Sequence, residues 1–152
     1  MFREFLPYDD IRVGDHTGVG GAPWTEYTYV DEVVGETYTL HVGRQCYLNL
    51  TSSVRTPNFG VIRELFIHEL THVWQGSHSV LHGSYQVSSF LSQAWALLST
   101  GDRGAAYDYV PGGDWFSYNV EQQANIVEDW FRAGAQPTHA SYRYIQNNIR
   151  KP

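Results

Sequence analysis

The sequence predicts an α+β domain in which strands come first and helices follow. Strand-forming β-branched and aromatic residues are concentrated from Trp24 to Leu50, whereas apolar residues in the second half recur at helical spacing. At 152 residues the chain has the length of one domain, so we expect a single domain over 1–152, strand-rich over 1–55 and helical over 58–150. With 42% hydrophobic and 17% charged residues, the composition is typical of a globular protein.

Two to four strands are expected in the first part, paired antiparallel. Thr and Tyr residues favour strands near Thr25–Tyr29 and Thr37–Val42, separated by a turn signal at Gly35. Tyr47–Leu50 alternates like a half-buried strand and predicts one more. A polar connection over 51–57 leads from these strands to the helices.

Apolar residues at helical spacing predict four helices, over about Asn58–Gln75, Gln86–Leu98, Asn119–Ala133 and Ser141–Ile149. Gly76 is expected to end the first helix. Asn119 is a favourable N-cap for the third helix, and Gly134 is expected to end it. The glycine-rich residues 101–117 predict an irregular loop or hairpin.

Charge and composition argue against several classes of partner. The net charge is −6 and the ten basic residues are scattered, so we expect no binding to nucleic acid or to a membrane surface. Cys46 is the only cysteine, which excludes an intrachain disulfide. Met1–Asp10 lacks the pattern of a signal peptide, and no apolar run is long enough to span a bilayer. We therefore expect synthesis in the cytoplasm without a signal peptide.

The segment His68–His72 is an H-E-x-x-H motif within the strongest helical pattern. Helical spacing of i and i+4 puts His68 and His72 on one face, where two ring nitrogens can bind one zinc ion. Glu69 is offset by one residue, beside the metal, where it can act as general base on a water molecule. The motif therefore predicts a zinc hydrolase with one Zn²⁺ per chain.

A catalytic zinc needs a third protein ligand. Glu121 opens the third predicted helix and could reach across to the first, and Asn125 one turn later could orient a ligand histidine. The other candidates are His78, Cys46, Glu128 and Asp129. His78 has the separation of an H-E-x-x-H-x-x-G-x-x-H site, but the glycine falls one place late and the Met-turn of that class has no methionine to form it.

Two segments together resemble a known family: H-E-L-T-H-V-W-Q over 68–75 and Y-N-V-E-Q-Q-A-N-I-V-E-D-W-F over 118–131. They are similar to small bacterial zincin-type metallopeptidase domains associated with polymorphic-toxin, Rhs/Vgr and type VI secretion genes. The resemblance covers about Leu40 to Arg150. It implies a zincin-like fold, in which a small antiparallel sheet packs on the H-E-x-x-H helix and two or three helices follow.

The resemblance also implies an activity and a site. By similarity to the wider gluzincin group, the chain looks like a zinc metallopeptidase with His68, His72 and Glu121 as ligands and Glu69 as base. That group often has Asp four residues after the ligand Glu, where this sequence has Asn125. The expected partners are a peptide or protein substrate and an immunity or secretion-apparatus protein, with export by a type VI-like route.

Peptidases of this kind need a donor for the oxyanion of the tetrahedral intermediate. We predict Tyr118 for this role, with Tyr107, Tyr109 and His139 as alternatives. An edge strand above the active-site helix would bind an extended peptide by strand addition, and Tyr47–Leu50 is the predicted strand.

Two other functions fit part of the sequence. A catalytically silent binding or assembly module would keep the scaffold without turnover, but it would have no need of Glu69 as a base. Peptide deformylases also combine H-E-x-x-H with a glycine-rich segment and a cysteine, which the segment Gly18–Pro23 and Cys46 resemble, yet no E-G-C-L-S stretch is present. We expect the chain to act as a monomer.

Overall fold

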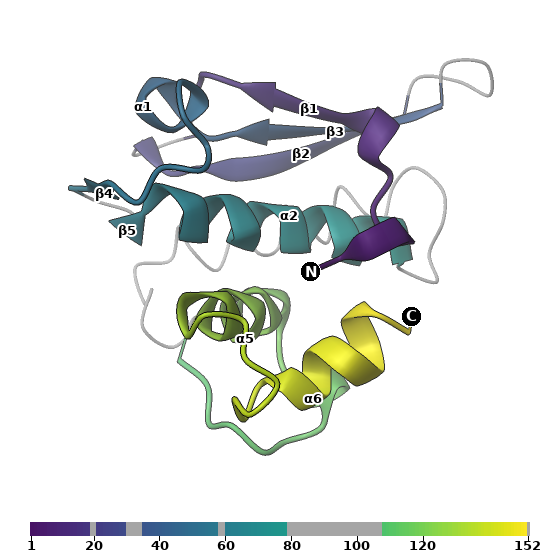
Figure 1. The fold of residues 1–152 in the computed structure, drawn as a ribbon. Helices are drawn as coiled ribbons and strands as arrows, with labels where there is room; N and C mark the ends of the chain where they lie inside the picture. The colour runs from purple at the N-terminus through teal and green to yellow at the C-terminus, as the bar shows by residue number, and fades with distance from the viewer. Residues whose placement is uncertain (19–20, 30–34, 58–59, 79–107, 152) are drawn as a thin grey trace.

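The computed structural model describes residues 1–18, 21–29, 35–57, 60–78 and 108–151. The elements in order are η1 (Arg3–Phe5), η2 (Tyr8–Asp10), β1 (Ile11–Gly14), β2 (Trp24–Tyr29), β3 (Glu36–His41), α1 (Arg44–Tyr47), β4 (Arg55–Thr56), β5 (Gly60–Val61), α2 (Ile62–His78), η4 (Trp115–Ser117), α5 (Val120–Arg132), α6 (Tyr142–Tyr144) and the π-helical η5 (Ile145–Ile149). Strands precede the long helices, which confirms the predicted α+β class. Figure 1 shows three layers: the sheet, then α2, then α5 with α6.

The main sheet has the strand order β1-β3-β2. β2 runs antiparallel to β3, with Tyr27 opposite Tyr38, as predicted. β1 pairs with β3 in parallel, so the sheet is mixed and the prediction of a purely antiparallel sheet was wrong. β1 was not predicted as a strand, because its four residues, ending at Gly14, are too short to show an alternating pattern.

One face of the sheet packs on α2, and alternation along the strands determines which side chains it carries. Thr25 and Tyr27 of β2 and Tyr38 and Leu40 of β3 are buried, whereas their neighbours along each strand are only partly buried or exposed. The rings of Tyr27 and Tyr38 are 5.3 Å apart. This inward face places Thr25 against the helix that carries the H-E-x-x-H motif.

The predicted strand over Tyr47–Leu50 was wrong, because this part of the chain begins in α1 and continues as turns. Its backbone groups bond locally: the Tyr47 N–H donates to the Gly43 carbonyl oxygen at 2.9 Å and the Leu48 N–H to that of Arg44 at 3.3 Å. Tyr47 and Leu48 are exposed. Alternation over four residues does not reveal whether a partner strand is available, and here local hydrogen bonds satisfy the backbone.

α2 begins later than predicted and continues through Gly76 to His78. The short β4–β5 ladder occupies part of the region before it. Gly76 is buried inside the helix, and both the Ser77 hydroxyl and Nδ1 of His78 lie 3.0–3.1 Å from the Trp74 carbonyl oxygen. A glycine ends a helix where its backbone adopts the left-handed conformation. At Gly76 tertiary packing outweighs the low helix propensity of glycine, so the predicted helix end at this residue was wrong.

The third predicted helix is α5, and its N-cap is confirmed. The Asn119 side chain accepts from the Gln122 backbone N–H while the Gln122 side chain accepts from that of Asn119, forming a capping box. Gly134, with φ of +81°, follows the end of the helix. The last predicted helix is present as α6 and η5, whereas the predicted helix over Gln86–Leu98 and residues 101–107 of the predicted loop lie outside the described residues.

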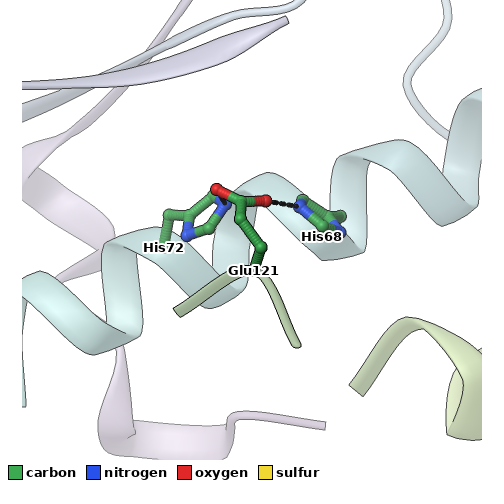
Figure 2. A group of neighbouring side chains, drawn as sticks. All are labelled: His68, His72 and Glu121. Atoms are coloured by element: carbon green, nitrogen blue, oxygen red, sulfur yellow. Dashed lines mark hydrogen bonds and ion pairs between the residues drawn. The ribbon is translucent and has the colours of Figure 1, made fainter. Parts of the chain in front are cut away.

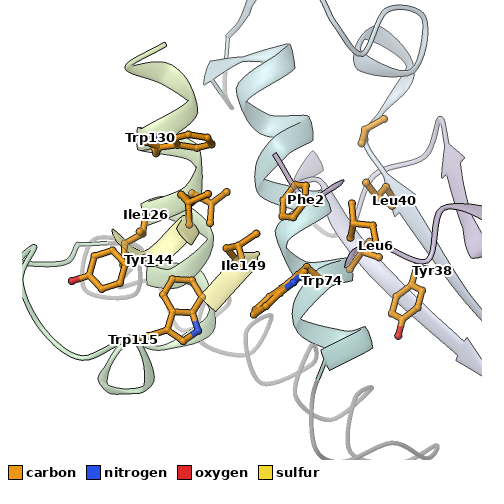
Figure 3. Close-up of a cluster of buried hydrophobic side chains, with 14 of the residues drawn as sticks. Phe2, Leu6, Tyr38, Leu40, Trp74, Trp115, Ile126, Trp130, Tyr144 and Ile149 are labelled. Carbon is orange, nitrogen blue, oxygen red and sulfur yellow. The ribbon is translucent and has the colours of Figure 1, made fainter. Parts of the chain in front are cut away.

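Apolar core residues pack against both faces of α2 (Figure 3). On the sheet side it includes Leu6, Tyr38 and Leu40, and on the other side Ile126 and Ile149. α2 is therefore a middle layer, and any polar side chain on the two faces that pack against the other layers is buried.

Within the described part of the chain, no helix is both long enough and apolar enough to cross a membrane.

We predict that Ile126→Ala lowers the free energy of unfolding by about 2–5 kcal/mol, because it removes a fully buried side chain between packed helices. Urea unfolding followed by circular dichroism measures the change. Phe116→Ala is the control, since Phe116 is 85% exposed and its loss should change stability by no more than about 0.5 kcal/mol. Equal effects of the two variants would contradict this description of the core.

Candidate metal centre

Two elements bring the predicted metal ligands together. α2 presents His68 and His72 one turn apart, and the first turn of α5 presents Glu121 opposite them. In Figure 2 the Glu121 carboxylate lies between the two imidazole rings. Each of the three residues offers one ligand atom, and these atoms all lie within 4.8 Å of one another, so the group could hold a metal ion.

The geometry of the three side chains fits a small divalent cation. Oε2 of Glu121 lies 3.1 Å from Nε2 of His68, and Oε1 lies 3.4 Å from Nε2 of His72. Ligand atoms of a tetrahedral zinc site are about 3.3 Å apart, given metal–ligand bonds of about 2.0–2.1 Å. All three side chains are buried, with residue exposures of 3–6%. The donor set, two imidazoles and a carboxylate, is one that zinc binds.

His68 is oriented through its second ring nitrogen by Glu128. Nδ1 of His68 lies 3.1 Å from Oε2 of Glu128, which is two turns after Glu121 on α5. Arg132 forms an ion pair with the other oxygen of Glu128 and bonds Glu64 of α2 at 3.0 Å. A carboxylate on the outer nitrogen of a ligand histidine fixes the ring and increases its basicity. Glu128, which the sequence offered only as a third ligand, thus orients His68, and the role of Asn125 stays a prediction.

His72 is oriented by Gln75, a residue that the sequence analysis did not single out. Nδ1 of His72 lies 2.8 Å from Oε1 of Gln75. Both histidines therefore direct Nδ1 at an acceptor and Nε2 at Glu121. The sequence did contain a signal for this contact, because a residue three positions after a ligand on the same helix lies beside that ligand.

Glu69 is buried on the side of α2 that faces the sheet. Its Oε2 accepts a 2.7 Å hydrogen bond from the Thr25 hydroxyl of β2. Thr25 was predicted only as part of a strand. The bond holds one carboxylate oxygen and leaves Oε1 to accept a proton, which suits the predicted general base.

The electrostatics of the group favour a bound cation. Burial lowers the pKa of His68, but the carboxylates of Glu121 and Glu128 outweigh burial and raise it to about 10. Burial likewise lowers the pKa of His72, and Glu121 raises it above its usual value. Burial raises the pKa of Glu121, but His72 and His68 bring it well below its usual range. Without metal, protons thus supply the positive charge that these carboxylates require.

The remaining candidate ligands have other surroundings. Cys46 is buried in α1, and burial raises the pKa of its thiol. The His78 ring stacks on Trp74 with ring centroids 4.9 Å apart. Asp129 accepts from the Tyr109 hydroxyl at 2.7 Å and from Arg132 at 2.8 Å. Within the described residues, the group that could hold a metal ion is the predicted one of His68, His72 and Glu121.

The described side chains that were predicted as oxyanion donors form hydrogen bonds to groups outside the metal centre. The Tyr118 hydroxyl donates to the Val110 carbonyl oxygen at 2.7 Å, and the Gly113 N–H donates to it at 2.8 Å. Nδ1 of His139 accepts from the Ser141 backbone N–H at 3.3 Å. Tyr107 lies outside the described residues. The assignment of Tyr118 stays a prediction.

The chain is similar in sequence to a known protein. It is 35% identical over 134 residues to the type VI secretion system spike protein VgrG2b of Pseudomonas aeruginosa. The aligned region covers 86% of this chain and 12% of that protein, so the chain spans about an eighth of its curated relative. No protein-family model and no solved structure match the chain. The comparison supports the predicted association with Vgr-type secretion proteins.

We predict that Glu128→Gln lowers the affinity for Zn²⁺ about 10-fold or more, because the ring of His68 loses the carboxylate that orients it. Competition with a chelating dye measures the affinity. Asp129→Asn is the matched control: it removes the same charge from the next residue of α5, where the side chain bonds Arg132 and Tyr109 instead of a histidine. A loss of the same size in both variants would mean that only net charge matters.

We further predict that binding of Zn²⁺ at pH 7 releases at least about one proton. The pKa of His68, about 10, keeps its imidazole protonated at this pH in the metal-free protein, the pKa of His72 is raised as well, and metal ligation requires neutral imidazole. Affinity should therefore rise as the pH rises from about 6 to about 8, because proton competition falls. Calorimetry in two buffers of different ionisation enthalpy measures the released protons, and identical heats in both would contradict the prediction.

Proposed function

We propose that this chain is a zinc-dependent metallopeptidase. The observation that carries the proposal is the convergence of His68, His72 and Glu121 from two helices, with Glu69 buried beside them and bonded to the sheet. A purely structural ion pair would need no such base. The H-E-x-x-H spacing on one helix and the third carboxylate on a later helix match the donor pattern of catalytic zinc sites.

Zinc bound by these residues would supply a Lewis acid that lowers the pKa of water and polarises the substrate carbonyl. The protein side chains then perform the proton transfers. Glu69 accepts a proton at Oε1 as the water oxygen bonds to the carbonyl carbon of the peptide. It returns the proton to the amide nitrogen as the C–N bond breaks, leaving a carboxylic acid and an amine.

β2 is the strand best placed to bind an extended peptide, in place of the predicted Tyr47–Leu50. It carries Thr25, which bonds Glu69, and within the described residues it pairs only on one side, with β3. An edge strand offers backbone N–H and carbonyl groups to an added strand. A peptide bound along β2 would thus pass beside the general base.

Tyr118 remains our proposed donor to the oxyanion of the tetrahedral intermediate. It precedes α5 by two residues and so lies close along the chain to Glu121. Its hydroxyl now donates to Val110, so this role requires the hydroxyl to turn away from that carbonyl oxygen when substrate binds.

We also propose that the chain acts as an antibacterial effector delivered by a type VI secretion system. The similarity to a stretch of the spike protein VgrG2b supports this, although it covers 12% of that protein. The expected partners are then a secretion-apparatus protein during export and an immunity protein in the producing cell. Export by this route would need no signal peptide.

The test is the variant Glu69→Gln. It should keep one zinc per chain by elemental analysis, whereas His72→Ala and Glu121→Ala should lose the metal. Cleavage of a mixed peptide library, followed by mass spectrometry, should fall by about 10²–10⁴-fold in Glu69→Gln, which is the usual contribution of a general base.

Glu4→Gln is the control, because it makes the same change at an exposed residue. A silent assembly module predicts instead that Glu69→Gln retains the full biological effect of the protein. Absence of bound zinc in the wild-type protein, with none taken up on addition, would overturn the proposed function altogether.

A further inference from the structure

We propose that Gln75 is a positioning residue that sets the metal-binding nitrogen of His72 and holds the end of α5 that carries Glu121. The inference rests on the proposed zinc site and deepens it. Gln75 lies one turn after His72 on α2 and is buried, with 5% of its surface exposed. Its side-chain amide uses both ends: Oε1 lies 2.8 Å from Nδ1 of His72, and Nε2 donates to the Val120 carbonyl oxygen at 2.9 Å.

The direction of the Gln75 amide is fixed by its partners on α5. A backbone carbonyl can only accept, so the NH₂ group of Gln75 has to face Val120. The same NH₂ group donates to Oε1 of Gln123 at 3.0 Å. Gln123 is fixed in the same way, because its own NH₂ group donates to the carbonyl oxygens of Trp115 at 3.0 Å and Tyr118 at 3.3 Å.

These hydrogen bonds determine which ring nitrogen of His72 carries the proton. Because Oε1 of Gln75 faces the ring, Nδ1 must carry the proton that it donates. In neutral imidazole the lone pair is then on Nε2, the nitrogen that faces Glu121. A histidine held in this tautomer is ready to bind a metal through Nε2, and its ring cannot turn without breaking the bond to Gln75.

The same amide also links two ligands that come from different helices. Val120 and Gln123 are both in the first turn of α5, on either side of Glu121. Gln75 therefore joins His72 of α2 directly to the backbone beside Glu121. His68 differs, since its Nδ1 faces a charged carboxylate, that of Glu128, instead of an amide oxygen.

The experiment compares zinc affinity in the wild-type protein, Gln75→Met and Gln146→Met, by competition with a chelating dye. Methionine is similar in size to glutamine but can neither accept from His72 nor donate to Val120. We expect Gln75→Met to bind zinc about 10–100-fold more weakly, as is usual on loss of a residue that orients a ligand. Gln146→Met, at an exposed residue of η5, should bind like the wild type.

A second measurement separates positioning from folding. Long-range ¹H–¹⁵N spectra of the zinc-loaded wild-type protein show which ring nitrogen of each histidine carries a proton. We expect the proton on Nδ1 of both His68 and His72, slow to exchange with water. In Gln75→Met the His72 proton should exchange quickly while that of His68 is unchanged, because Glu128 still holds it.

The outcomes distinguish this inference from the proposed function. Wild-type protein that binds no zinc would overturn the peptidase proposal and the inference with it. Wild-type protein that binds one zinc, beside a folded Gln75→Met variant of equal affinity, would overturn only the role of Gln75. If Gln75→Met does not fold, a wild-type spectrum with the proton of His72 on Nε2 would overturn that role on its own.

Discussion

The structure depends on how α2 satisfies the polar side chains that it buries. α2 lies between the sheet and the helical layer of α5 and α6 (Figure 1). Polar side chains on its two covered faces are therefore almost fully buried. An unpaired polar group in that position costs about 1–3 kcal/mol, and an unpaired charge costs more. Each buried ionisable group on α2 has a partner on another layer: Glu64 on Arg132, His68 on Glu121 and Glu128, Glu69 on Thr25, and His72 on Glu121.

The partners on the two sides of α2 serve different purposes. The sheet provides one hydroxyl, from Thr25, and it bonds the carboxylate of Glu69. α5 provides carboxylates and backbone carbonyl oxygens, which bond the histidines directly or through Gln75. The proposed base is therefore positioned by one layer and the proposed metal ligands by the other.

Features of the structure that are encoded locally could be predicted from the sequence. Helical geometry alone places His68 and His72 on one face. The capping box at Asn119 likewise depends on only four consecutive residues. The choice of Glu121 among the candidate third ligands depended on the resemblance to a family, because no local pattern relates residues 53 positions apart. Gln75 and Thr25 were missed as site residues for a related reason. Glutamine on a helix and threonine on a strand are ordinary, and only packing shows what they touch.

The errors in the fold have the same origin. Tyr47–Leu50 alternates like a strand, but whether a strand forms depends on a partner strand, which a single segment does not reveal. Gly76 predicted a helix end, yet burial of α2 on both sides outweighs a propensity cost of about 1 kcal/mol. In each case the local signal was weak, and tertiary packing determined the result.

The bond between Thr25 and Glu69 bears on whether the site is catalytic. The group of His68, His72 and Glu121 could hold a metal ion without Glu69, so a site that served only stability would gain nothing from a buried carboxylate at position 69. Burying that carboxylate carries a desolvation cost, which the single 2.7 Å hydrogen bond from Thr25 offsets only in part. An apolar residue at this position would pack against the sheet at lower cost. A proton acceptor kept beside the candidate metal ligands, at the expense of stability, is what the proposed hydrolase requires.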